Sequence, residues 1–142
     1  MIRIEYPKYD FRFKKEENKE FIFDDIRRIW LRLTPEEWVR QNFLQYLIQT
    51  MKYPASLIAV EKEIKLGELR KRCDIVVYKD SKPWMIVECK EMHIPISNAV
   101  ASQIFNYNQT LAVDYLIITN GNNTFGLSTL SGQQIIILPD FL

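Results

Sequence analysis

Apolar and charged residues alternate around a polar segment near the start of the chain. Phe11 and Phe13 precede the charged stretch 14–20, and Phe21 and Phe23 follow it. Alternation on both sides of a polar tip is typical of a hairpin or an extended arm. The next segment, 24–33, mixes apolar and basic residues and fits either a short helical turn or a strand. We therefore expect residues 1–33 to form an N-terminal extension packed on a larger domain over 34–142.

A helical period begins directly after this extension. Residues 34–37, Thr-Pro-Glu-Glu, combine a capping threonine, a proline suited to the first turn, and acids that favour the positive end of the helix dipole. Apolar residues then recur at every fourth position from Val39 to Met51. The pattern predicts a helix over about 34–51. Glu37 falls on its inner face at helical spacing, so we expect Glu37 rather than Glu36 to face the interior.

Strongly apolar runs and a second helical period make up the rest of the chain. The predicted elements are a strand at 57–66, strands at 72–78 and 84–90 joined by a turn at 79–83, a helix at 97–112, a strand at 115–119, and short strands at 125–130 and 134–138. Ser97 caps the second helix, and Val100, Ile104 and Leu111 should face inward. Strands this apolar are typical of a sheet covered on both faces. We predict an α/β fold: a central mixed sheet flanked by helices, with an α-β-β-β-α-β core.

Composition places the chain among ordinary globular proteins. It has 142 residues, 47% of them apolar and 26% charged, which suits one domain. No apolar run approaches the roughly 18–20 residues of a membrane span, and no signal-peptide core is present, so we expect a cytoplasmic protein with no membrane partner. Cys73, Cys89 and the one histidine, His93, are too few for a disulfide scaffold or a zinc cluster. We expect both cysteines to pack as small apolar groups on the sheet face opposite the interior acids.

The charges nearly balance, with 19 basic and 18 acidic residues and a formal net charge of +1. This excludes a histone-like polycation but not a DNA-binding protein, because phosphate contacts need only a local basic patch. Basic residues cluster around the strands that carry the interior acids: Lys62, Lys65, Arg70, Lys71, Arg72, Lys79 and Lys82. They form either a DNA-facing rim or a soluble edge, and we favour the rim. Trp30, Trp38 and Trp84 are expected in the core rather than on a base-stacking surface.

Acids inside apolar strands are the most informative feature. Asp74 lies within RCDIVVY, and Glu88 and Lys90 lie at the end of WMIVECK. Ionised groups in buried strands are costly unless they are paired, hydrogen-bonded or bound to a metal. Alternation places Glu88 and Lys90 on one face and Cys89 on the other. If Asp74 shares their face, two carboxylates and an amine meet at one point.

Two neighbouring carboxylates repel each other unless a cation joins them. Hard oxygen ligands without histidine favour Mg²⁺ or Mn²⁺ over Zn²⁺. A protonated Lys90 would not bind such a metal, but it can orient a water and stabilise negative charge on a phosphate. The set therefore suits metal-assisted hydrolysis of a phosphodiester. A purely structural interpretation remains open, in which Asp74 pairs with Arg70 or Arg72. Glu61 and Glu63 are alternative third carboxylates, although a solvated strand face explains them better.

The spacing from Asp74 to Lys90, D-x13-E-x-K, resembles the PD-(D/E)xK nuclease motif, with Cys73 where a proline usually stands. Gln103 and Tyr107, on the predicted second helix, resemble the QxxxY subset of these nucleases. Together with TPEEWVRQ at 34–41, YPASLIAVEKEIKLG at 53–67 and YLIITNG at 115–121, these motifs resemble the N-terminal nuclease domain of type I restriction enzyme R proteins. The resemblance covers roughly residues 21–130.

This resemblance implies a restriction-endonuclease-like fold and a Mg²⁺- or Mn²⁺-dependent DNA endonuclease. The implied site residues are Asp74, Glu88, Lys90, Glu37, Gln103 and Tyr107. The implied metal ligands are Asp74, Glu88, the backbone carbonyl of Cys89, and Glu37 either directly or through water. Lys90 would position the attacking water, and Gln103 and Tyr107 would shape the site.

Partners and rival functions follow from what the chain lacks. R proteins continue into a helicase motor, whereas no GxxxxGK[ST] loop occurs here. We therefore expect a stand-alone nuclease that acts on DNA, with a helicase or another restriction or repair subunit as a candidate partner. One alternative is a non-catalytic nucleic-acid-binding or regulatory module that retains the nuclease fold. Another is a structure-specific resolvase that works as a homodimer.

Overall fold

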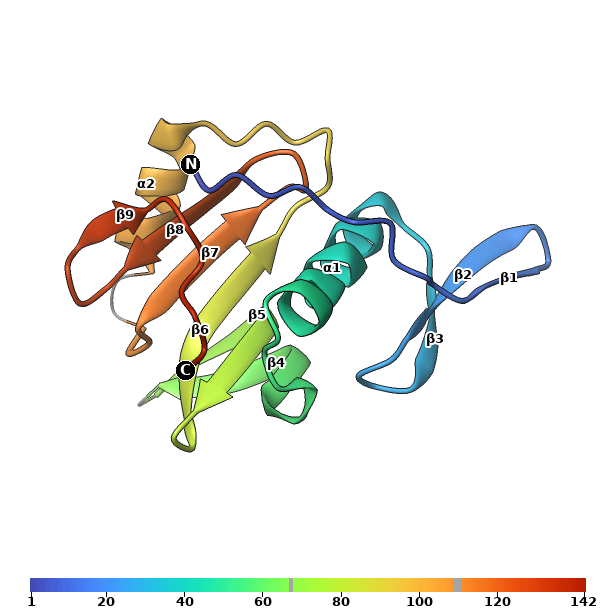
Figure 1. Cartoon of the computed structure of the whole chain (residues 1–142), viewed down its shortest axis with the longest axis horizontal. Helices are drawn as coiled ribbons and strands as arrows, with labels where there is room; N and C mark the ends of the chain where they lie inside the picture. Colours follow the sequence, from blue (N-terminus) through green and yellow to red (C-terminus); the bar gives the residue numbers. More distant parts are fainter. Residues whose placement is uncertain (67, 109–110) are drawn as a thin grey trace.

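The N-terminal segment forms a small antiparallel sheet of its own. The computed structural model describes residues 1–66, 68–108 and 111–142, without the side chains of 66, 69 and 107. Strands β1 (Phe13–Glu16), β2 (Lys19–Asp24) and β3 (Ile29–Arg32) lie in the order β1-β2-β3 (Figure 1). Glu17 and Asn18 at the hairpin tip have φ values of 50° and 63°, which suit a tight turn. The predicted hairpin is confirmed, and the ambiguous segment 24–33 is a turn followed by a strand.

The larger sheet is mixed, as predicted. Its strands in spatial order are β4 (Ile58–Leu66), β5 (Leu69–Lys79), β6 (Lys82–Cys89), β7 (Tyr115–Thr119), β8 (Thr124–Ser128) and β9 (Gln133–Ile135). Only the β6–β7 pair in this list is parallel; the other neighbours are antiparallel. β5 begins earlier than the predicted residue 72, and β9 ends before the predicted residue 138.

Helix α1 (Pro35–Gln45) begins where the sequence predicts. The Thr34 hydroxyl accepts a hydrogen bond from the Glu37 amide at 3.1 Å, which satisfies one of the free donors of the first turn. The helix continues as a π-helical turn over Tyr46–Thr50, and a short 3-10 turn over Ala55–Leu57 leads into β4. Glu37 is buried and Glu36 is exposed, so the predicted inner face is confirmed.

Helix α2 (Asn98–Tyr107) is shorter than the predicted segment 97–112. Ser97 caps it, accepting from the Val100 amide at 3.2 Å. The predicted inner face is wrong at Val100, which is 39% exposed, whereas Ala101 and Phe105 are 0% and 3% exposed. Ala101 and Phe105, which are spaced four apart, form the apolar stripe of this helix instead, and Leu111 lies beyond its end.

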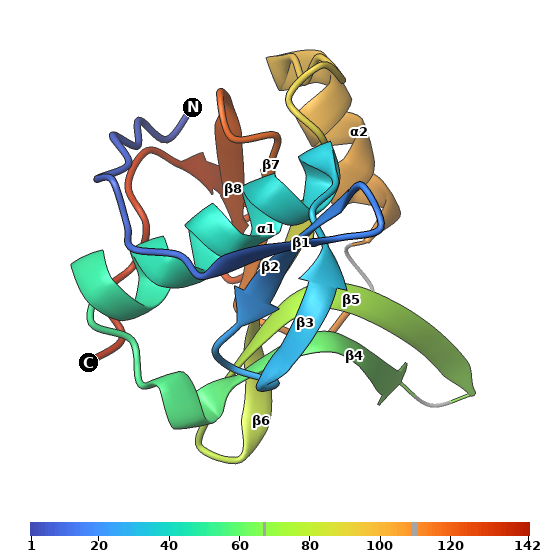
Figure 2. The ribbon, with the colours of Figure 1, turned by 90° about the vertical axis from the view of Figure 1, so that its right-hand side faces the viewer.

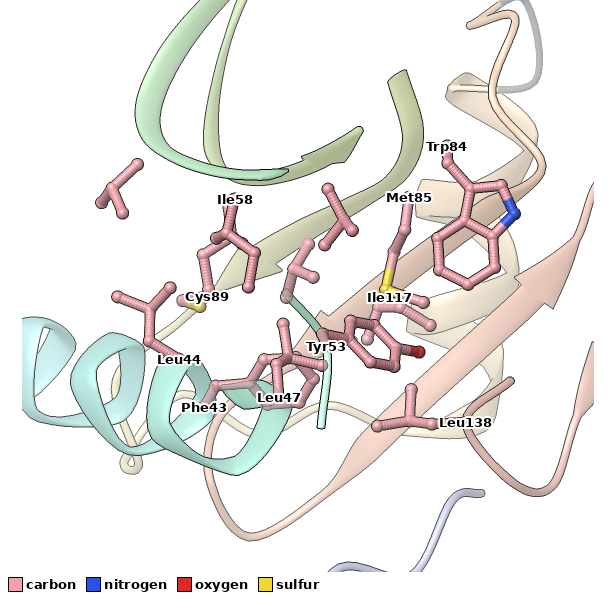
Figure 3. Close-up of a cluster of buried hydrophobic side chains, with 14 of the residues drawn as sticks. Phe43, Leu44, Leu47, Tyr53, Ile58, Trp84, Met85, Cys89, Ile117 and Leu138 are labelled. Atoms are coloured by element: carbon pink, nitrogen blue, oxygen red, sulfur yellow. The ribbon is translucent and has the colours of Figure 1, made fainter. Parts of the chain in front are cut away.

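The two helices cover opposite faces of the larger sheet (Figures 1 and 2). Under α1, one apolar core includes Phe43, Leu44, Leu47, Ile75, Val77, Met85, Val87 and Ile117 (Figure 3). Under α2, a second core includes Ala101, Phe105, Val76, Ile86, Leu116 and Ile118. Consecutive residues of β5, β6 and β7 therefore enter different cores, which explains why these strands are apolar throughout. No helix in the described part of the chain is long and apolar enough to cross a membrane.

The β4–β5 hairpin changes face at Glu61 and Asp74. Residues two or four apart in a strand normally share a face, but Val60 and Ile75 join the α1-side core, whereas Ile64 and Cys73 join the α2-side core. The switch lies between the pairs Val60↔Ile75 and Lys62↔Cys73, where Glu61 has a left-handed φ of 50°. Figure 2 shows β4 and β5 curving away from the rest of the sheet.

This switch corrects one sequence expectation. Cys73 and Cys89 are both buried, as predicted, but they do not share a face. Cys89 lies in the α1-side core and Cys73 in the α2-side core. Burial raises the pKa of the Cys73 thiol to about 11 and that of the Cys89 thiol well above its ordinary value, so both cysteines act as small apolar groups in their separate cores.

Candidate active site

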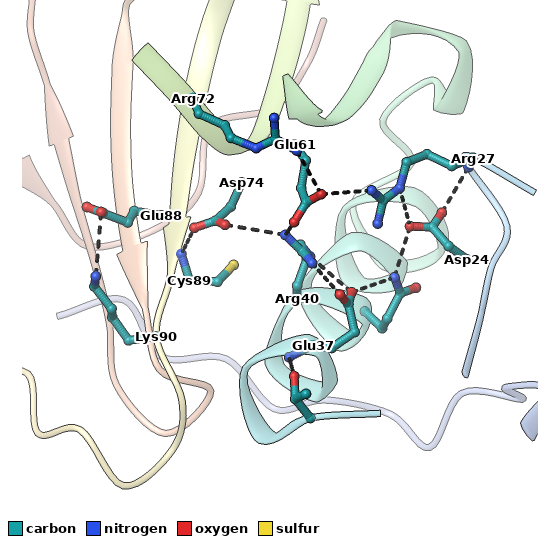
Figure 4. Close-up of polar contacts among 12 residues, drawn as sticks. Asp24, Arg27, Glu37, Arg40, Glu61, Arg72, Asp74, Glu88, Cys89 and Lys90 are labelled. Carbon is teal, nitrogen blue, oxygen red and sulfur yellow. Dashed lines mark hydrogen bonds and ion pairs between the residues drawn. The ribbon is translucent and has the colours of Figure 1, made fainter. Parts of the chain in front are cut away.

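Asp74 lies in β5 beside the end of β6, and both of its oxygens have partners (Figure 4). Its Oδ2 accepts a hydrogen bond from the backbone amide of Cys89 at 2.8 Å. Its Oδ1 lies 3.4 Å from a guanidinium nitrogen of Arg40 on α1. The structural alternative of pairing with Arg70 or Arg72 is wrong, because the face switch turns Asp74 toward α1.

Glu88 and Lys90 share a face at the end of β6, as alternation predicts. The Lys90 Nζ lies 3.7 Å from Glu88 Oε1. The Lys90 amide donates to the carbonyl of Thr119 at 2.8 Å, which continues the β6–β7 ladder by one residue and fixes the lysine backbone. Both side chains line a cleft of about 330 Å³ between the sheet and α2, whose other lining residues are Lys71, Gln103, Ile104 and Asn108.

Asp74 and Glu88 interact electrostatically but point in different directions. Figure 4 shows the Glu88 carboxylate directed toward Lys90 and away from Asp74. Burial raises the pKa of Asp74 above its usual value, and the charge of Glu88 raises it further. The Cys89 amide and the charges of Arg40 and Lys90 oppose this shift without cancelling it. A cation placed between the two carboxylates would relieve this repulsion.

Arg40 joins three carboxylates at the centre of the site. Its guanidinium binds both Glu37 oxygens, through Nε–Oε2 at 3.0 Å and a second, shorter contact to Oε1. It also contacts Glu61 at 3.0 Å and Asp74 at 3.4 Å. Burial alone would lower the pKa of Arg40, but Glu37 and Glu61 raise it above its ordinary value. Arg40 is therefore a permanent positive charge in the position where the acids converge.

Glu61 accepts contacts from three arginines, which contradicts the expectation that it belongs to a solvated strand face. Arg27, Arg40 and Arg72 approach its carboxylate at 3.1, 3.0 and 3.1 Å. Burial would raise the pKa of Glu61, but the charges and hydrogen bonds of these arginines lower it overall. The left-handed backbone of Glu61 turns its side chain toward α1, while Glu63 stays exposed as predicted.

The N-terminal sheet is connected to this cluster through Asp24. Asp24 is fully buried at the end of β2 and accepts hydrogen bonds from the amides of Ile26 and Arg27 at 2.9 Å. The Gln41 side chain donates to Asp24 at 3.1 Å and to Glu37 at 3.0 Å. A continuous set of polar contacts therefore runs from β2 through α1 to Asp74.

Sequence reasoning missed three members of the cluster: Asp24, Arg27 and Arg40. The available signal for Arg40 was its position three residues after Glu37, on the same side of an amphipathic helix. In the described part of the chain, the cluster sets four carboxylates (Asp24, Glu37, Glu61, Asp74) against three guanidinium groups (Arg27, Arg40, Arg72). Each carboxylate contacts at least one guanidinium group, and the carboxylates outnumber the guanidinium groups by one.

The remaining predicted residues are placed as follows. Gln103 is exposed on α2 and lines the cleft with Glu88 and Lys90. Tyr107 is in the last turn of α2, and its side chain lies outside the described residues. Cys89 ends β6, and the metal-ligand role of its carbonyl stays a prediction. Among the described residues, no three side chains of His, Cys, Asp or Glu are arranged so that they could hold a metal ion together, because Arg40 lies between the acids of its cluster.

The expected core position of the tryptophans is correct only for Trp84. Trp84 is buried and contacts Tyr53, Tyr115 and Phe141. Trp30 and Trp38 are 37% and 36% exposed, on β3 and α1. A larger hollow of about 530 Å³ lies at the other end of β6, near Lys82 and Trp84, and none of the predicted catalytic residues lines it.

A comparison with protein families identifies the family of the chain. The family described as the N terminus of type I restriction enzyme R proteins matches residues 35–141, from the first residue of α1 to beyond β9. No curated protein matches the chain. The matched region contains Glu37, Arg40, Asp74, Glu88, Lys90 and Gln103.

Proposed function

We propose a nuclease function on the premise that the chain belongs to the family of type I restriction enzyme R protein N termini. Membership of this family indicates a function related to restriction nucleases. More specifically, we propose a Mg²⁺- or Mn²⁺-dependent endonuclease of the PD-(D/E)xK class that hydrolyses DNA phosphodiesters in the cytoplasm. Its order of elements, α1-β4-β5-β6-α2-β7, supports a restriction-endonuclease-like fold.

The observation that carries this proposal is the position of D-x13-E-x-K, whose first acid lies in β5 beside the end of β6, where the rest of the motif lies. Asp74 is held by the amide of Cys89, and Cys89 stands between Glu88 and Lys90. This hydrogen bond therefore fixes Asp74, the first acid of the motif, next to the Glu88–Lys90 segment. Glu88 and Lys90 open into a cleft beside Gln103, where a phosphate and its scissile bond can enter from solvent.

The donor set fits a hard divalent cation. Asp74, Glu88 and the Cys89 carbonyl offer only oxygen ligands, which Mg²⁺ and Mn²⁺ prefer. Burial raises the pKa of Asp74 and the charge of Glu88 adds to this rise; a bound cation would neutralise that repulsion between the two carboxylates. When bound, the metal would supply Lewis-acid activation of the phosphate and of a water.

The chain's own groups have distinct roles around that donor set. Lys90, whose backbone is fixed by Thr119, orients the attacking water and offsets negative charge on the phosphate. Gln103 contacts the nucleic acid from α2. Glu37 is a positioning residue in this arrangement, because its carboxylate is held by Arg40 and Gln41. Arg40 in turn positions Asp74.

A plasmid-nicking assay tests the proposal. The purified chain should nick supercoiled DNA with Mg²⁺ or Mn²⁺ but not in EDTA. Asp74→Asn and Lys90→Ala should each reduce the rate by at least about 100-fold, as expected for loss of a metal ligand and of a water-positioning group. Full activity in both variants would contradict the assignment.

Matched controls separate chemistry from folding. Asp80→Asn removes an exposed carboxylate in the turn of the β5–β6 hairpin, and Lys8→Ala removes an exposed lysine of the N-terminal segment, outside the basic rim. Both should retain near-normal nicking. A loss of activity equal to that of Asp74→Asn or Lys90→Ala would indicate a general charge effect.

One observation favours a second candidate, a non-catalytic nucleic-acid-binding or regulatory module. Each proposed carboxylate already has a protein cation as a partner: Arg40 for Asp74 and Glu37, and Lys90 for Glu88. Because each carboxylate is paired with a cationic side chain, the chain can keep this fold without a bound metal. The second candidate predicts DNA binding with steep salt dependence and no cleavage with any divalent metal. It would act beside a helicase or another restriction subunit.

A further inference from the structure

The outer face of the N-terminal sheet combines aromatic rings with cations. Cross-strand pairing puts Lys14 opposite Phe21, Phe21 opposite Arg32, and Phe23 opposite Trp30. Directly paired residues share a face of a sheet. We call this surface the aromatic–basic face and define it by Arg12, Lys14, Phe21, Phe23, Trp30 and Arg32.

The inner face of the same sheet is already covered by α1. Ile22 is fully buried, and Asp24 accepts the hydrogen bond from Gln41 of α1. Phe11, just before β1, packs against Trp38 of α1 with ring centroids 5.2 Å apart. Figure 2 shows the small sheet crossing in front of α1, so its outer face is directed to solvent.

Cations lie over the rings of the aromatic–basic face. The Arg12 guanidinium is 3.9 Å from the centroid of the Phe23 ring, and Lys14 Nζ is 4.8 Å from that of Trp30. Arg32 lies 6.0 Å from the Phe21 ring. These contacts hold the charged groups above the sheet rather than at its rim. Glu16 pairs with Lys14 at 3.2 Å, and the face still keeps a positive excess from its arginines.

We propose that the aromatic–basic face binds single-stranded nucleic acid. Unpaired bases stack on exposed aromatic rings and on guanidinium planes, while phosphates pair with cations on the same surface. Paired bases in a duplex are stacked on their neighbours and cannot offer their faces to Trp30. The mixture of rings and positive charges therefore complements a single strand better than a duplex.

The position of the face gives this binding a role in the proposed nuclease, and that role rests on the proposed function. The turn after β2 carries Arg27, which reaches Glu61 at 3.1 Å, and Asp24 connects through Gln41 to Glu37. A single strand of nucleic acid bound to the N-terminal sheet would therefore lie on an element that is fixed to the acid cluster. The face would select DNA with unpaired segments for the site formed by Asp74 of β5 and the end of β6.

Fluorescence anisotropy in EDTA tests binding separately from cleavage. A labelled 15-nucleotide oligo(dT) should bind more tightly than a duplex of the same length. Trp30→Ala should weaken oligo(dT) binding by roughly 5- to 150-fold, the range expected for loss of one stacked base. Trp30→Phe should restore most of the affinity. Arg32→Gln should lower the slope of log affinity against log salt by roughly 0.7, as for one lost phosphate contact on a single strand.

Two matched variants control for exposure and charge. Trp38→Ala removes a tryptophan of nearly equal exposure from the other side of the sheet, and Arg3→Gln removes an exposed arginine outside the face. Both should bind oligo(dT) like the parent. Circular dichroism should show that all variants fold.

Three results would overturn the proposal: unchanged binding in Trp30→Ala, equal loss in Trp38→Ala, or equal competition by polyglutamate, which would indicate an acidic protein as the partner. Because binding is measured in EDTA, a failed nuclease assignment would leave the binding result intact.

Discussion

Replacing Arg40 with methionine removes the cation shared by three carboxylates. Arg40 and Glu37 are only 9% and 6% exposed, so the variant leaves the Glu37 carboxylate buried without its guanidinium partner. Breaking a buried ion pair by removing one partner costs about 3–5 kcal/mol. This is a large part of the roughly 5–15 kcal/mol that stabilises a typical domain. We expect the urea midpoint to fall by about 2 M if the unfolding slope is about 2 kcal/mol per molar urea.

A double-mutant cycle identifies the cause of that loss. In the double variant Glu37→Gln/Arg40→Met the buried charge is gone, and the amide introduced at position 37 can still hydrogen-bond to Gln41. We expect the double variant to recover at least about 1 kcal/mol relative to Arg40→Met alone, since residues in direct contact show coupling of this size. Arg28→Met is the control, because this arginine is exposed and lies 3.9 Å from Asp25; it should cost less than about 1 kcal/mol.

Urea unfolding followed by circular dichroism measures the parent and all of these variants. If Arg40→Met unfolds the chain completely, Arg40→Lys keeps one charge and should retain a measurable transition. A loss of less than about 1 kcal/mol of unfolding free energy in Arg40→Met would contradict this prediction. So would unfolding free energies of the Glu37 and Arg40 variants that add without coupling.

Two further predictions concern the acid cluster and the sheet. Glu61→Gln should cost about 1–2 kcal/mol at pH 7, allowing for partial exposure, and the exposed neighbour Glu63→Gln should cost almost nothing. Because arginine contacts lower the pKa of Glu61, the stabilisation from its carboxylate is present above the ordinary pKa of about 4.3 and is lost as the pH falls through the lowered pKa. The difference in urea midpoint between the parent and Glu61→Gln should therefore be smaller at pH 3 than at pH 7. An equal difference at both pH values would contradict this prediction. Gly126→Ala should destabilise by about 1–3 kcal/mol, because a Cβ there would lie 2.8 Å from Cδ1 of Ile117 and 2.9 Å from Ile135. Ile117→Val, which removes that Cδ1 atom, should recover part of this loss in thermal unfolding, and no recovery would argue against a steric cause.

Local patterns in the sequence predict most elements of the fold because their causes are local. The cap at Thr34 and the inward position of Glu37 depend on residues within one helical turn. The strands under both helices follow from unbroken apolar runs. The predicted end of α2 is wrong because residues 108–110, Asn-Gln-Thr, include no glycine or proline that would mark a stop, and the apolar residues 111–113 that follow suggest that the helical pattern continues.

The partners of the acids could not be predicted, because they depend on contacts between distant segments. Arg40 reaches Asp74 across 34 positions, and Arg27 reaches Glu61 across the same separation. Helical or strand periodicity does not encode which arginine meets which carboxylate. Exposure of Trp30 was also missed, because an alternating strand gives no sign of which face a distant helix will cover.

The face switch at Glu61 and Asp74 decides how the candidate site can work. It separates the acids around Arg40, on the α1 side, from the ion pair of Glu88 and Lys90, on the α2 side. A cation that joins Asp74 to Glu88 must therefore compete with Arg40 for one oxygen and with Lys90 for another. The Arg40–Asp74 contact, at 3.4 Å, is longer than the contacts of Arg40 with Glu61, at 3.0 Å, and with the two oxygens of Glu37. Arg40 can thus release Asp74 and remain in the cluster, so that metal binding requires a change at one carboxylate rather than disruption of the buried network.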